Sequence, residues 1–335
     1  NYFSKINLVV NKKFHSQAEY LYSLNSSINI VSDNPEIVND LDEYVNNLAV
    51  SKGLKVLRVG QLKTGKPFYE EFYKSVKLSY KHSYKNFFLP ENKDLQKELK
   101  RVTPDFIINT AAMTNVDACE NDKEKCYDLN VNVVQYLTDY CNDYYSHLIH
   151  LSTDFIFDGK QGNYTEVDTP NPLSYYGETK LKSEKILEKS SIDFTILRTI
   201  LVYGLVNDMS RSNIVLWVKE SLEKRKEITI VDDQFRTPTY VEDLAISCKL
   251  SIDKKATGIF NVSSSQLLSI YEIAIEIADS FGLDKSLIKP ISTATLNQTA
   301  PRPAKTGFNL TKTNKVLGLF PKTFKEDLQR FKQKL

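Results

Sequence analysis

Glycine is scarce in this sequence, and its scarcity excludes an intact version of a common nucleotide-binding signature. The 335 residues include 11 glycines, and only Gly53, Gly60 and Gly65 precede residue 159. Neither G-x-G-x-x-G nor G-x-x-G-x-x-G can therefore occur in the first 158 residues, although such turns bind dinucleotides at the start of many α/β domains. Any dinucleotide-binding turn in this part of the chain must be a degenerate one.

Metal-ligand patterns are also missing. The four cysteines show no C-x-x-C spacing and no partnering histidine, and we expect them to be buried or incidental thiols of a reducing compartment. The four histidines are scattered, and His150 lies inside the apolar run 148–151, where a core histidine is expected. The sequence therefore indicates no metal site.

Long apolar runs and an excess of either charge are absent too. No stretch approaches roughly 18 uninterrupted apolar residues and no signal-peptide pattern opens the sequence, so we expect a cytoplasmic protein without membrane insertion. The 44 basic residues are balanced by 42 acidic ones, which argues against a dedicated nucleic-acid surface. Hydrophobic residues make up 41% and charged residues 26%, as in an ordinary soluble globular protein.

From residue 54 onward, short apolar runs alternate with amphipathic stretches. The expected strands are 54–59, 105–109, 147–151, 194–198 and 259–262. The expected helices are 67–76, 91–101, 122–144, 176–189, 211–225 and 270–281. Strands that alternate with helices of this length predict an α/β fold with a doubly wound, mostly parallel sheet. Residues 1–53 read as strand 6–10, helix 16–24, strand 28–32 and helix 35–51, a βαβα start without a glycine turn.

The segment 56–72, VLRVGQLKTGKPFYEEF, begins like a phosphate-binding loop. Gly60 to Lys66 matches the first seven positions of G-x-x-x-x-G-K-[ST]. The eighth position should carry the hydroxyl that ligates Mg²⁺, but it is Pro67, which suits the first turn of a helix instead. The strand 105–109 also ends in Asn109 rather than in a metal-binding Asp. Both features argue against a P-loop NTPase.

Two later segments carry residues with catalytic potential. LSTDFIFDG (151–159) follows a strand, and NPLSYYGETKLKSEKIL (171–187) opens a helix on which Tyr176 and Lys180 lie one turn apart on the same face. A nearby ammonium is expected to lower the pKa of the Tyr176 hydroxyl, which would then protonate a carbonyl oxygen as hydride reaches its carbon. Thr153, at the carboxyl end of a parallel strand, could bind the same oxygen. Alone, Y-x-x-x-K on a Tyr- and Lys-rich helix is more often structural.

Further segments accompany this pair and together resemble a known family. They are PDFIINTAAMTNVD (104–117), Glu120, Leu129 with Asn130, STDFIFDG (152–159), NPLSYYGETKL (171–181), LRT (197–199), VYG (202–204), VDDQFRTPT (231–239), EDLA (242–245) and Arg302 with Pro303. In this order they resemble the extended short-chain dehydrogenases, most closely the dTDP-4-dehydrorhamnose reductases. The regulatory β subunit of methionine adenosyltransferase shares the pattern. The resemblance covers roughly residues 54 to 335.

The resemblance implies a Rossmann-like NAD(P)-binding domain, a smaller C-terminal lobe for a nucleotide sugar, and hydride transfer to the C4 ketone of a 4-keto-6-deoxy sugar. It implies domain bounds of 54–204 plus 229–262 for the cofactor domain and 205–228 plus 263–335 for the lobe, with 1–53 as an N-terminal extension or part of the cofactor domain. It also allows a homodimer or a regulatory protein partner.

Carried over position by position, the resemblance gives each candidate residue a role. Tyr176 would be the general acid, Lys180 would hold the nicotinamide ribose and tune Tyr176, and Thr153 would complete the triad. The residues implied along the cofactor are Gly60, Lys63, Gly65, Lys66, Ala111, Ala112 and Asn130. Those implied near the sugar nucleotide are Asp154, Phe155, Gln234, Arg236, Thr237 and Arg302. Asp117 and Asp158 fit either a site role or ordinary turn and capping chemistry.

This sequence departs from the family's pattern at two of these segments. Phe155 stands where the family usually has Tyr, and Leu201 stands where it usually has Trp. The first change removes a hydroxyl and the second a large flat surface near the expected sugar. The identity of the sugar therefore does not follow from the resemblance.

The family's glycine turn can be placed in two registers. The late register, which we favour, makes 54–59 the first strand and VGQLKTGK (59–66) the turn, with the family's spacing onward to Asn109 and Tyr176. Lys63 then replaces the second glycine and Lys66 the third. The early register makes 6–10 the first strand, followed by NKKFHSQ (11–17), and leaves about 45 extra residues to be absorbed. In either one a side chain hinders approach of the pyrophosphate.

The two registers predict different cofactors. In the late register Lys81, His82 and Lys85 end the second strand and suit a 2′-phosphate, hence NADPH. In the early register Asp33 ends the strand 28–32 and suits a ribose 2′-hydroxyl, hence NADH. We expect NADPH, with NADH as the alternative. The intact Thr153, Tyr176 and Lys180 favour a reductase. The degenerate glycine turn leaves open an alternative, a catalytically inactive regulatory or scaffold protein of the same fold. Residues 1–53 could also be a remnant or an attachment domain.

Overall fold

The computed structural model describes residues 6–11, 28–33, 93–205, 213–296 and 298–335. The chain divides into two compact units, residues 1–83 and 84–335. In the first unit, β1 (Ile6–Asn11) and β2 (Ile28–Asp33) pair in parallel, with Ile6 opposite Ile28 and Asn11 opposite Asp33. These are the two strands of the early register. The late register's strand 54–59, its turn and its basic residues at 81–85 lie outside the described residues, so the choice of register stays a prediction.

The second unit is built on a parallel sheet. Four strands lie in the order β10-β5-β4-β3, and every neighbouring pair is parallel. They are β3 (Phe106–Asn109), β4 (His147–Thr153), β5 (Phe194–Thr199) and β10 (Gly258–Val262). The α/β class and the parallel sheet predicted from the sequence are thereby confirmed.

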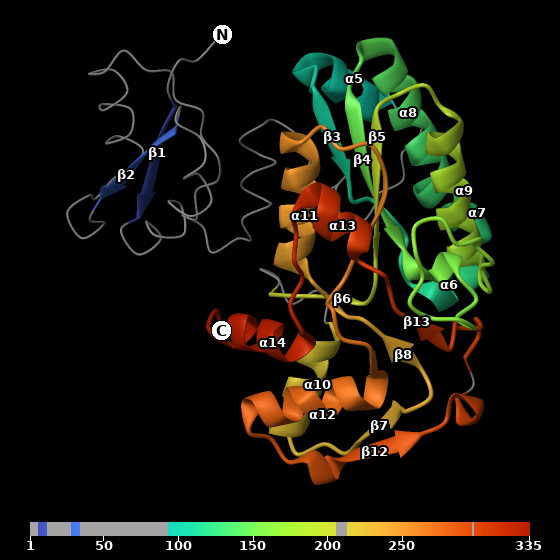
Figure 1. Ribbon diagram of the computed structural model, residues 1–335, viewed down its shortest axis with the longest axis vertical. Coiled ribbons are helices and arrows are strands. Elements are labelled where there is room, and N and C mark those ends of the chain that lie inside the picture. The colour runs from blue at the N-terminus through green and yellow to red at the C-terminus, as the bar shows by residue number, and fades with distance from the viewer. Residues whose placement is uncertain (1–5, 12–27, 34–92, 206–212, 297) are drawn as a thin grey trace. The chain divides into compact units, whose positions relative to one another are not determined.

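Helices cover both faces of this sheet. α5 (Lys93–Val102) precedes β3. The elements between the later strands are α6 (Val116–Asn121), α7 (Lys123–Tyr127), the π-helical turn η2 (Asp128–Asn132), α8 (Val133–Tyr144), the 3₁₀ turn η3 (Asp154–Ile156), α9 (Tyr175–Lys189) and α11 (Val241–Asp253), and α13 (Thr311–Leu317) packs on β10. Figure 1 shows α8 and α9 on one side of the sheet and α11 and α13 on the other.

The alternation of side chains along β4 divides the core between these two layers. Leu148 packs with Leu187 of α9 and with α8, whereas Ile149 packs with Leu244 of α11 and with Leu317 of α13. Successive side chains of a strand point to opposite faces, and a sheet that is covered on both sides needs apolar residues at both. The continuous apolar runs in the sequence are therefore the signature of this two-sided core.

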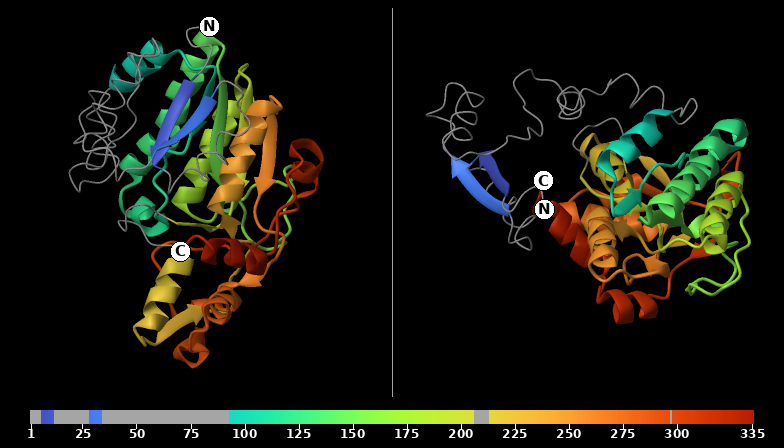
Figure 2. Two further views of the ribbon diagram at one scale, coloured as in Figure 1. Left: turned by 90° about the vertical axis from the view of Figure 1, so that its left-hand side faces the viewer. Right: turned by 90° about the horizontal axis from the view of Figure 1, so that it is seen from above.

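A separate cluster of apolar side chains forms a smaller lobe. Its helices are α10 (Ile214–Glu223), α12 (Ile270–Phe281) and α14 (Phe324–Lys332), and its strands β7 (Ile228–Val231) and β12 (Ile288–Ile291) pair in parallel. Figures 1 and 2 show this lobe beyond one end of the sheet. The domain bounds drawn from the sequence stay a prediction. Those bounds assign most of β7 to the cofactor domain, but β7 packs in this lobe.

Short elements link the lobe to the sheet. They are β6 (Val202–Tyr203), β8 (Phe235–Arg236), β9 (Thr239–Tyr240), β11 (Leu268–Ser269), β13 (Lys305–Thr306) and the 3₁₀ turn η5 (Thr293–Thr295), whereas the 3₁₀ turn η4 (Lys285–Leu287) joins α12 to β12 within the lobe. β8 lies between β11 and β13, so three segments far apart in sequence meet there. Among the residues that the structure describes, no helix is both long enough and apolar enough to cross a membrane.

Local signals in the sequence explain where the main helices begin and end. The hydroxyl of Ser174 accepts from the amide of Gly177 at the start of α9. At α12, Ser269 and Glu272 form a reciprocal capping box, and Gly282 ends the helix with φ +68°. Polar N-cap side chains and a C-terminal glycine of this kind satisfy backbone groups that have no hydrogen-bond partner within the helix.

Candidate active site

The carboxyl end of β4 and the first turn of α9 bring the predicted catalytic residues together. Thr153 is the last residue of β4, and its hydroxyl caps η3 by accepting from the amide of Phe155 at 3.3 Å while donating to Asp154 Oδ1 at 3.1 Å. Gly177 allows α9 to approach η3 closely, because a Cβ on this residue would lie 2.2 Å from the Phe155 carbonyl oxygen. Tyr176 is thereby placed beside Thr153, whose hydroxyl is close enough to favour the phenolate form of Tyr176.

Tyr176 is buried, and its ring meets that of Phe155 edge-on with centroids 5.6 Å apart. Burial raises the pKa of the Tyr176 hydroxyl above its usual value, and the hydrogen bond to Thr153 opposes this effect. The expectation that the pKa of Tyr176 is lowered by Lys180 is therefore wrong for this structure, because removal from water outweighs the favourable contacts. At neutral pH the hydroxyl keeps the proton that a general acid needs.

Lys180 lies one turn along α9 from Tyr176 and is also buried, so the two share a face as predicted. Its Nζ donates to the Leu151 carbonyl oxygen at 2.7 Å and lies 3.1 Å from His150 Nε2. Burial lowers the pKa of Lys180 to about 8, although the carboxylate of Glu184 favours the charged form. The amine is therefore held against the end of β4, with a charge that changes near physiological pH.

Asn130 fastens the loop that follows β3. Its Oδ1 accepts from the Met113 amide at 2.8 Å, and its Nδ2 donates to the Met113 carbonyl oxygen at 3.1 Å and to Thr179 Oγ1 on α9 at 3.0 Å. The side chain is fully buried. Ala111 and Ala112 lie in the loop that Asn130 holds, and the amide of Ala111 donates to Asn109 Oδ1 at 3.1 Å. Their small side chains leave this loop accessible to a ligand.

Two cysteines underlie the site and were not singled out by the sequence. Cys119 and Cys126 are fully buried in one apolar cluster with Tyr176, and Cys126 Sγ lies 3.4 Å from Thr179 Oγ1. The contact between the two thiols lowers the pKa of Cys126 to about 7 and raises that of Cys119. All four cysteines are free and buried, as expected. The spacing of Cys119 and Cys126 along the chain does not predict their contact, because it depends on the turn through which α6 and α7 meet.

Asp154 is the centre of a buried polar cluster on the lobe side. Thr306 Oγ1 donates to Asp154 Oδ2 at 2.5 Å, and Arg236 Nε lies 3.6 Å from the same oxygen. Burial raises the pKa of Asp154, while Arg236 opposes the shift. The guanidinium of Arg236 also donates to the carbonyl oxygens of Pro303 and Ala304 and lies over the Phe155 ring at 5.9 Å. The substrate candidates Asp154, Phe155 and Arg236 are therefore neighbours.

The other substrate candidates have partners of their own. Gln234 donates to Thr293 Oγ1 at 3.0 Å, and Thr237 donates to Ser263 Oγ at 2.9 Å. Arg302 is bound to Asp117, so Asp117 is an ion-pair residue rather than only a cap. Asp158 accepts from the amide of Lys160 at 3.1 Å, which is the turn chemistry considered for it. The cofactor-loop candidates Gly60, Lys63, Gly65 and Lys66 lie outside the described residues.

A buried ion pair that was not predicted from the sequence joins α9 to β5. Arg198 Nη2 lies 2.7 Å from Glu184 Oε2, and both side chains are at most 2% exposed. Ser152 Oγ donates to the other oxygen of Glu184 at 2.5 Å. Their spacing along the chain matches no motif, because the pair forms only when α9 packs over β4 and β5. It fixes the helix that carries Tyr176 and Lys180.

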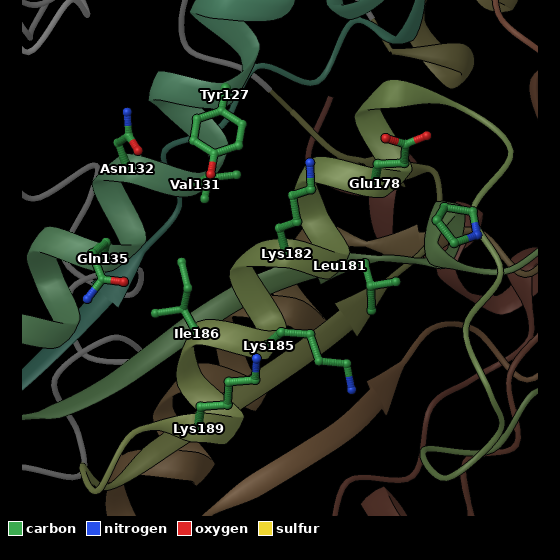
Figure 3. Close-up of a pocket in the computed structure, with 11 residues that line it drawn as sticks. Tyr127, Val131, Asn132, Gln135, Glu178, Leu181, Lys182, Lys185, Ile186 and Lys189 are labelled. Atoms are coloured by element: carbon green, nitrogen blue, oxygen red, sulfur yellow. The ribbon is translucent and has the colours of Figure 1, made fainter.

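A surface cavity of about 580 Å³ lies on the outer side of α8 and α9. Figure 3 shows Tyr127 and Val131 on one wall and Lys182, Lys185 and Lys189 on the other. Tyr176 and Lys180 do not line it. Among the described residues, no group of three or more His, Cys, Asp and Glu side chains is arranged to hold a metal ion.

The described residues fit a nicotinamide dinucleotide at the carboxyl edge of the sheet. The hydroxyls of Thr153 and Tyr176 lie there, and the amine of Lys180 contacts the Leu151 carbonyl on the same strand; such donors suit ribose hydroxyls and a substrate carbonyl. The loop at Ala111 and Ala112 offers backbone without bulky side chains, and its position is fixed by Asn130. If a dinucleotide binds at this edge, these residues would meet its nicotinamide end.

Comparisons with known proteins agree with this geometry. The family described as RmlD substrate binding domain matches residues 75–335. A dTDP-4-dehydrorhamnose reductase of Aggregatibacter actinomycetemcomitans is 33% identical over 241 residues, 68% of this chain and 81% of that protein. Methionine adenosyltransferase 2 subunit beta of Bos taurus is 32% identical over 194 residues, and the match covers 56% of this chain and 58% of that protein.

The fold has a counterpart among solved structures. The crystal structure of a dTDP-4-dehydrorhamnose reductase of Bacillus anthracis, in complex with NADP, superposes with a TM-score of 0.69 over 99% of this chain and 100% of that one. The two sequences are 21% identical in that superposition. The similarity confirms the Rossmann-like fold.

Proposed function

Because the chain belongs to the RmlD substrate binding domain family, a family of sugar-nucleotide reductases, we propose that it is an NAD(P)H-dependent reductase of a nucleotide-linked 4-keto-6-deoxy sugar, of the dTDP- or UDP-4-dehydrorhamnose type. The observation that carries the proposal is the convergence of Thr153, Tyr176 and Lys180 at the carboxyl end of β4. An inactive protein has no need to keep all three buried at one edge of the sheet.

In this proposal Tyr176 is the general acid. A nicotinamide cofactor, when bound, supplies the hydride. The Tyr176 hydroxyl gives its proton to the ketone oxygen, and the Thr153 hydroxyl turns away from Asp154 to donate a second hydrogen bond to the same oxygen. Lys180 holds the nicotinamide ribose and, in its charged form, stabilises the phenolate that Tyr176 becomes.

The substrate would lie between this edge and the lobe. Arg236 and Arg302 supply positive charge for the diphosphate of a nucleotide sugar, and Gln234 and Thr237 lie on the same segment of chain as Arg236. NADP in the structure of the Bacillus anthracis reductase supports NADPH as the cofactor, with NADH as the alternative.

The test is consumption of NADPH in the presence of dTDP-4-dehydrorhamnose or its UDP counterpart. Tyr176→Phe should lower turnover by about a hundredfold or more, because it removes the acid. Tyr175→Phe is the matched control: Tyr175 is the adjacent residue of α9, but its ring lies near Lys123 and Lys182 on the outside, so turnover should be unchanged. No binding of NADPH or NADH by calorimetry, with or without sugar nucleotide, would contradict the proposal.

A regulatory protein without catalysis is the second candidate, and the similarity to methionine adenosyltransferase 2 subunit beta favours it. In that case Tyr176→Phe would leave the protein's binding to a partner unchanged, and wild-type protein would not consume NADPH with any 4-keto sugar nucleotide. Pull-down with a methionine adenosyltransferase catalytic subunit separates the two candidates.

A further inference from the structure

A buried polar pair lies directly beneath Lys180, between α9 and the sheet, and the proposed chemistry does not use it. His150 and Asn109 stand opposite each other in the register of β4 and β3 and are 1% and 5% exposed. His150 was predicted to be a core histidine, and its burial confirms this. Its Nε2 lies 3.1 Å from Lys180 Nζ, so the ring is the nearest polar side chain to a candidate catalytic amine.

The contacts of Asn109 determine which nitrogen of His150 carries the proton. Asn109 Oδ1 accepts from the Ala111 amide at 3.1 Å, which leaves the Nδ2 group facing His150 Nδ1 at 3.1 Å. An amide nitrogen only donates, so Nδ1 must accept. A neutral imidazole has one donor and one acceptor nitrogen, and its proton is therefore on Nε2.

Ser183 supports the same assignment independently. Its hydroxyl donates to the Lys180 carbonyl oxygen at 2.7 Å, which leaves the oxygen as an acceptor. His150 Nε2 lies 3.1 Å from that oxygen and can donate to it only if the ring proton is on Nε2. The two neighbours of the ring, one on each nitrogen, thus require one tautomer.

This tautomer acts on Lys180. An ammonium group has only donors, and the ring nitrogen nearest to Lys180 Nζ presents a proton instead of a lone pair. The charged form of Lys180 therefore has no acceptor in His150, because the proton on Nε2 is donated to Ser183 Oγ and no lone pair of this nitrogen faces the ammonium. The ring disfavours the charge on Lys180 in addition to the effect of burial.

We propose that Asn109 fixes His150 as its Nε2–H tautomer and that His150 thereby sets the charge of Lys180, so that both are positioning residues for proton transfer by Tyr176. The statement about the tautomer concerns the protein alone, and only the consequence for Tyr176 rests on the proposed function. Several other groups face Lys180 and act on it together with His150. They are Glu184 of α9, the Leu151 carbonyl of β4, and the Cys126 thiol of α7.

The tautomer can be tested without any ligand. In protein labelled with ¹⁵N-histidine, the ring signals of His150 should show Nε2–H and should not titrate between about pH 5 and pH 9. His150→Gln identifies which signals belong to this residue. Asn109→Asp keeps an acceptor for the Ala111 amide and places a second one at His150 Nδ1, so the ring proton should move to Nδ1 and leave Nε2 as an acceptor. A wild-type ring with Nδ1–H, or one that titrates near its usual value, would overturn the assignment.

The effect on Lys180 is tested by two variants with a predicted direction. Asn109→Asp turns a lone pair of His150 toward Lys180, and His150→Gln offers a carbonyl oxygen, so both should favour the ammonium. We expect the titration of the Lys180 ε-carbon, followed by ¹³C NMR, to move upward by about one pH unit in each. The alkaline limb of the turnover profile should move by the same amount, because the charged amine persists to higher pH.

His147→Gln is the matched control. His147 is the other buried histidine of β4, and its Nε2 contacts Thr195 at 2.8 Å rather than Lys180. This variant should lose stability without moving either titration. If the variants at 109 and 150 also lose stability with no shift in the Lys180 titration, their role is only structural and the inference is overturned. If wild-type protein shows no turnover, the proposed function fails, and the two NMR titrations still decide the inference.

Discussion

Arg302 and Asp117 hold each other by two hydrogen bonds, although they are 185 positions apart in the chain. Nη2 lies 2.7 Å from Oδ2 and Nη1 lies 3.2 Å from Oδ1, and the amide of Ala300 donates to the same carboxylate at 3.0 Å. These contacts with Arg302 and Ala300 lower the pKa of Asp117. The pair ties the segment that begins at Ala300 to α6, on the rim of the candidate site.

Arg302→Lys should weaken this connection while keeping the charge. An ammonium cannot reproduce the two-point contact, and because the Asp117 side chain is 38% exposed the loss should be only about 0.5–1 kcal/mol of unfolding free energy. The KM for the nucleotide sugar should rise with kcat little changed, because the reacting atoms lie elsewhere. Asp117→Asn should destabilise by a similar amount. The free energy of unfolding is measured in urea for both single variants and for the double variant. If the loss in the double variant equals the sum of the two single losses, the residues are not coupled.

Gly177→Ala should damage both stability and turnover. The added Cβ would stand 2.2 Å from the Phe155 carbonyl oxygen and 3.0 Å from Pro172 Cβ, so α9 must move away from η3. We expect a loss of about 1–3 kcal/mol and a fall in kcat of about tenfold or more, since Tyr176 moves relative to Thr153. Gly282→Ala is the control, because its Cβ meets open space; its φ of +68° should cost about 1 kcal/mol and leave kcat unchanged.

Glu184→Gln should be among the most destabilising single substitutions of a charged residue. It leaves the guanidinium of Arg198 buried without a counter-charge, which should cost about 3 kcal/mol or more. Glu188→Gln, which removes the exposed partner of Lys185 on the same helix, should cost at most about 0.5 kcal/mol. Both losses are measured by chemical denaturation. Equal losses in the two variants would show that the buried pair does not stabilise α9.

The pH dependence of stability should reveal Asp327 on α14. This carboxyl is 1% exposed, and burial raises its pKa from 3.8 to about 6, against the influence of Arg330. A raised pKa contributes stability that is present below pH 3.8 and is lost as the pH rises through about 6. Relative to Asp327→Asn, wild-type protein should therefore lose up to about 3 kcal/mol across that window.

Leu328→Ala provides the control for the Asp327 experiment. Leu328 is fully buried on the same helix, so its truncation should weaken α14 at every pH without changing the slope. If the difference between wild type and Asp327→Asn does not vary with pH, Asp327 does not titrate as its burial requires.

The sequence predicted the sheet and its covering helices well, because each carries a local signal. The runs at 105–109, 147–151, 194–198 and 259–262 are all strands, and the pattern at 270–281 is α12 with the same bounds. The two-residue strands β8, β11 and β13 were not predicted. They exist only because three distant segments meet, and no periodicity can develop over two residues.

For the candidate site, residue types were predictable and their environments were not. Tyr176 and Lys180 share a buried face as their spacing requires, yet the pKa of Tyr176 moves in the opposite direction to the one expected. Its direction depends on how completely α9, η3 and the cysteine pair exclude water, which is a property of packing. The contact between His150 and Lys180 likewise depends on α9 lying over β4, so it could not be predicted from their spacing along the chain.

The contacts around Asp154 have a consequence for how this protein is made. Its partners Arg236 and Thr306 come much later in the chain, and the separation between Asp117 and its partner Arg302 is larger still. On the ribosome the N-terminal parts of a protein emerge first, so the sheet edge that bears Thr153 and Tyr176 is synthesised long before the residues that neutralise its buried carboxylate. Until Arg236 emerges, the nascent chain lacks the counter-charge of Asp154, and the polar cluster around this carboxylate cannot be complete before synthesis has reached Thr306.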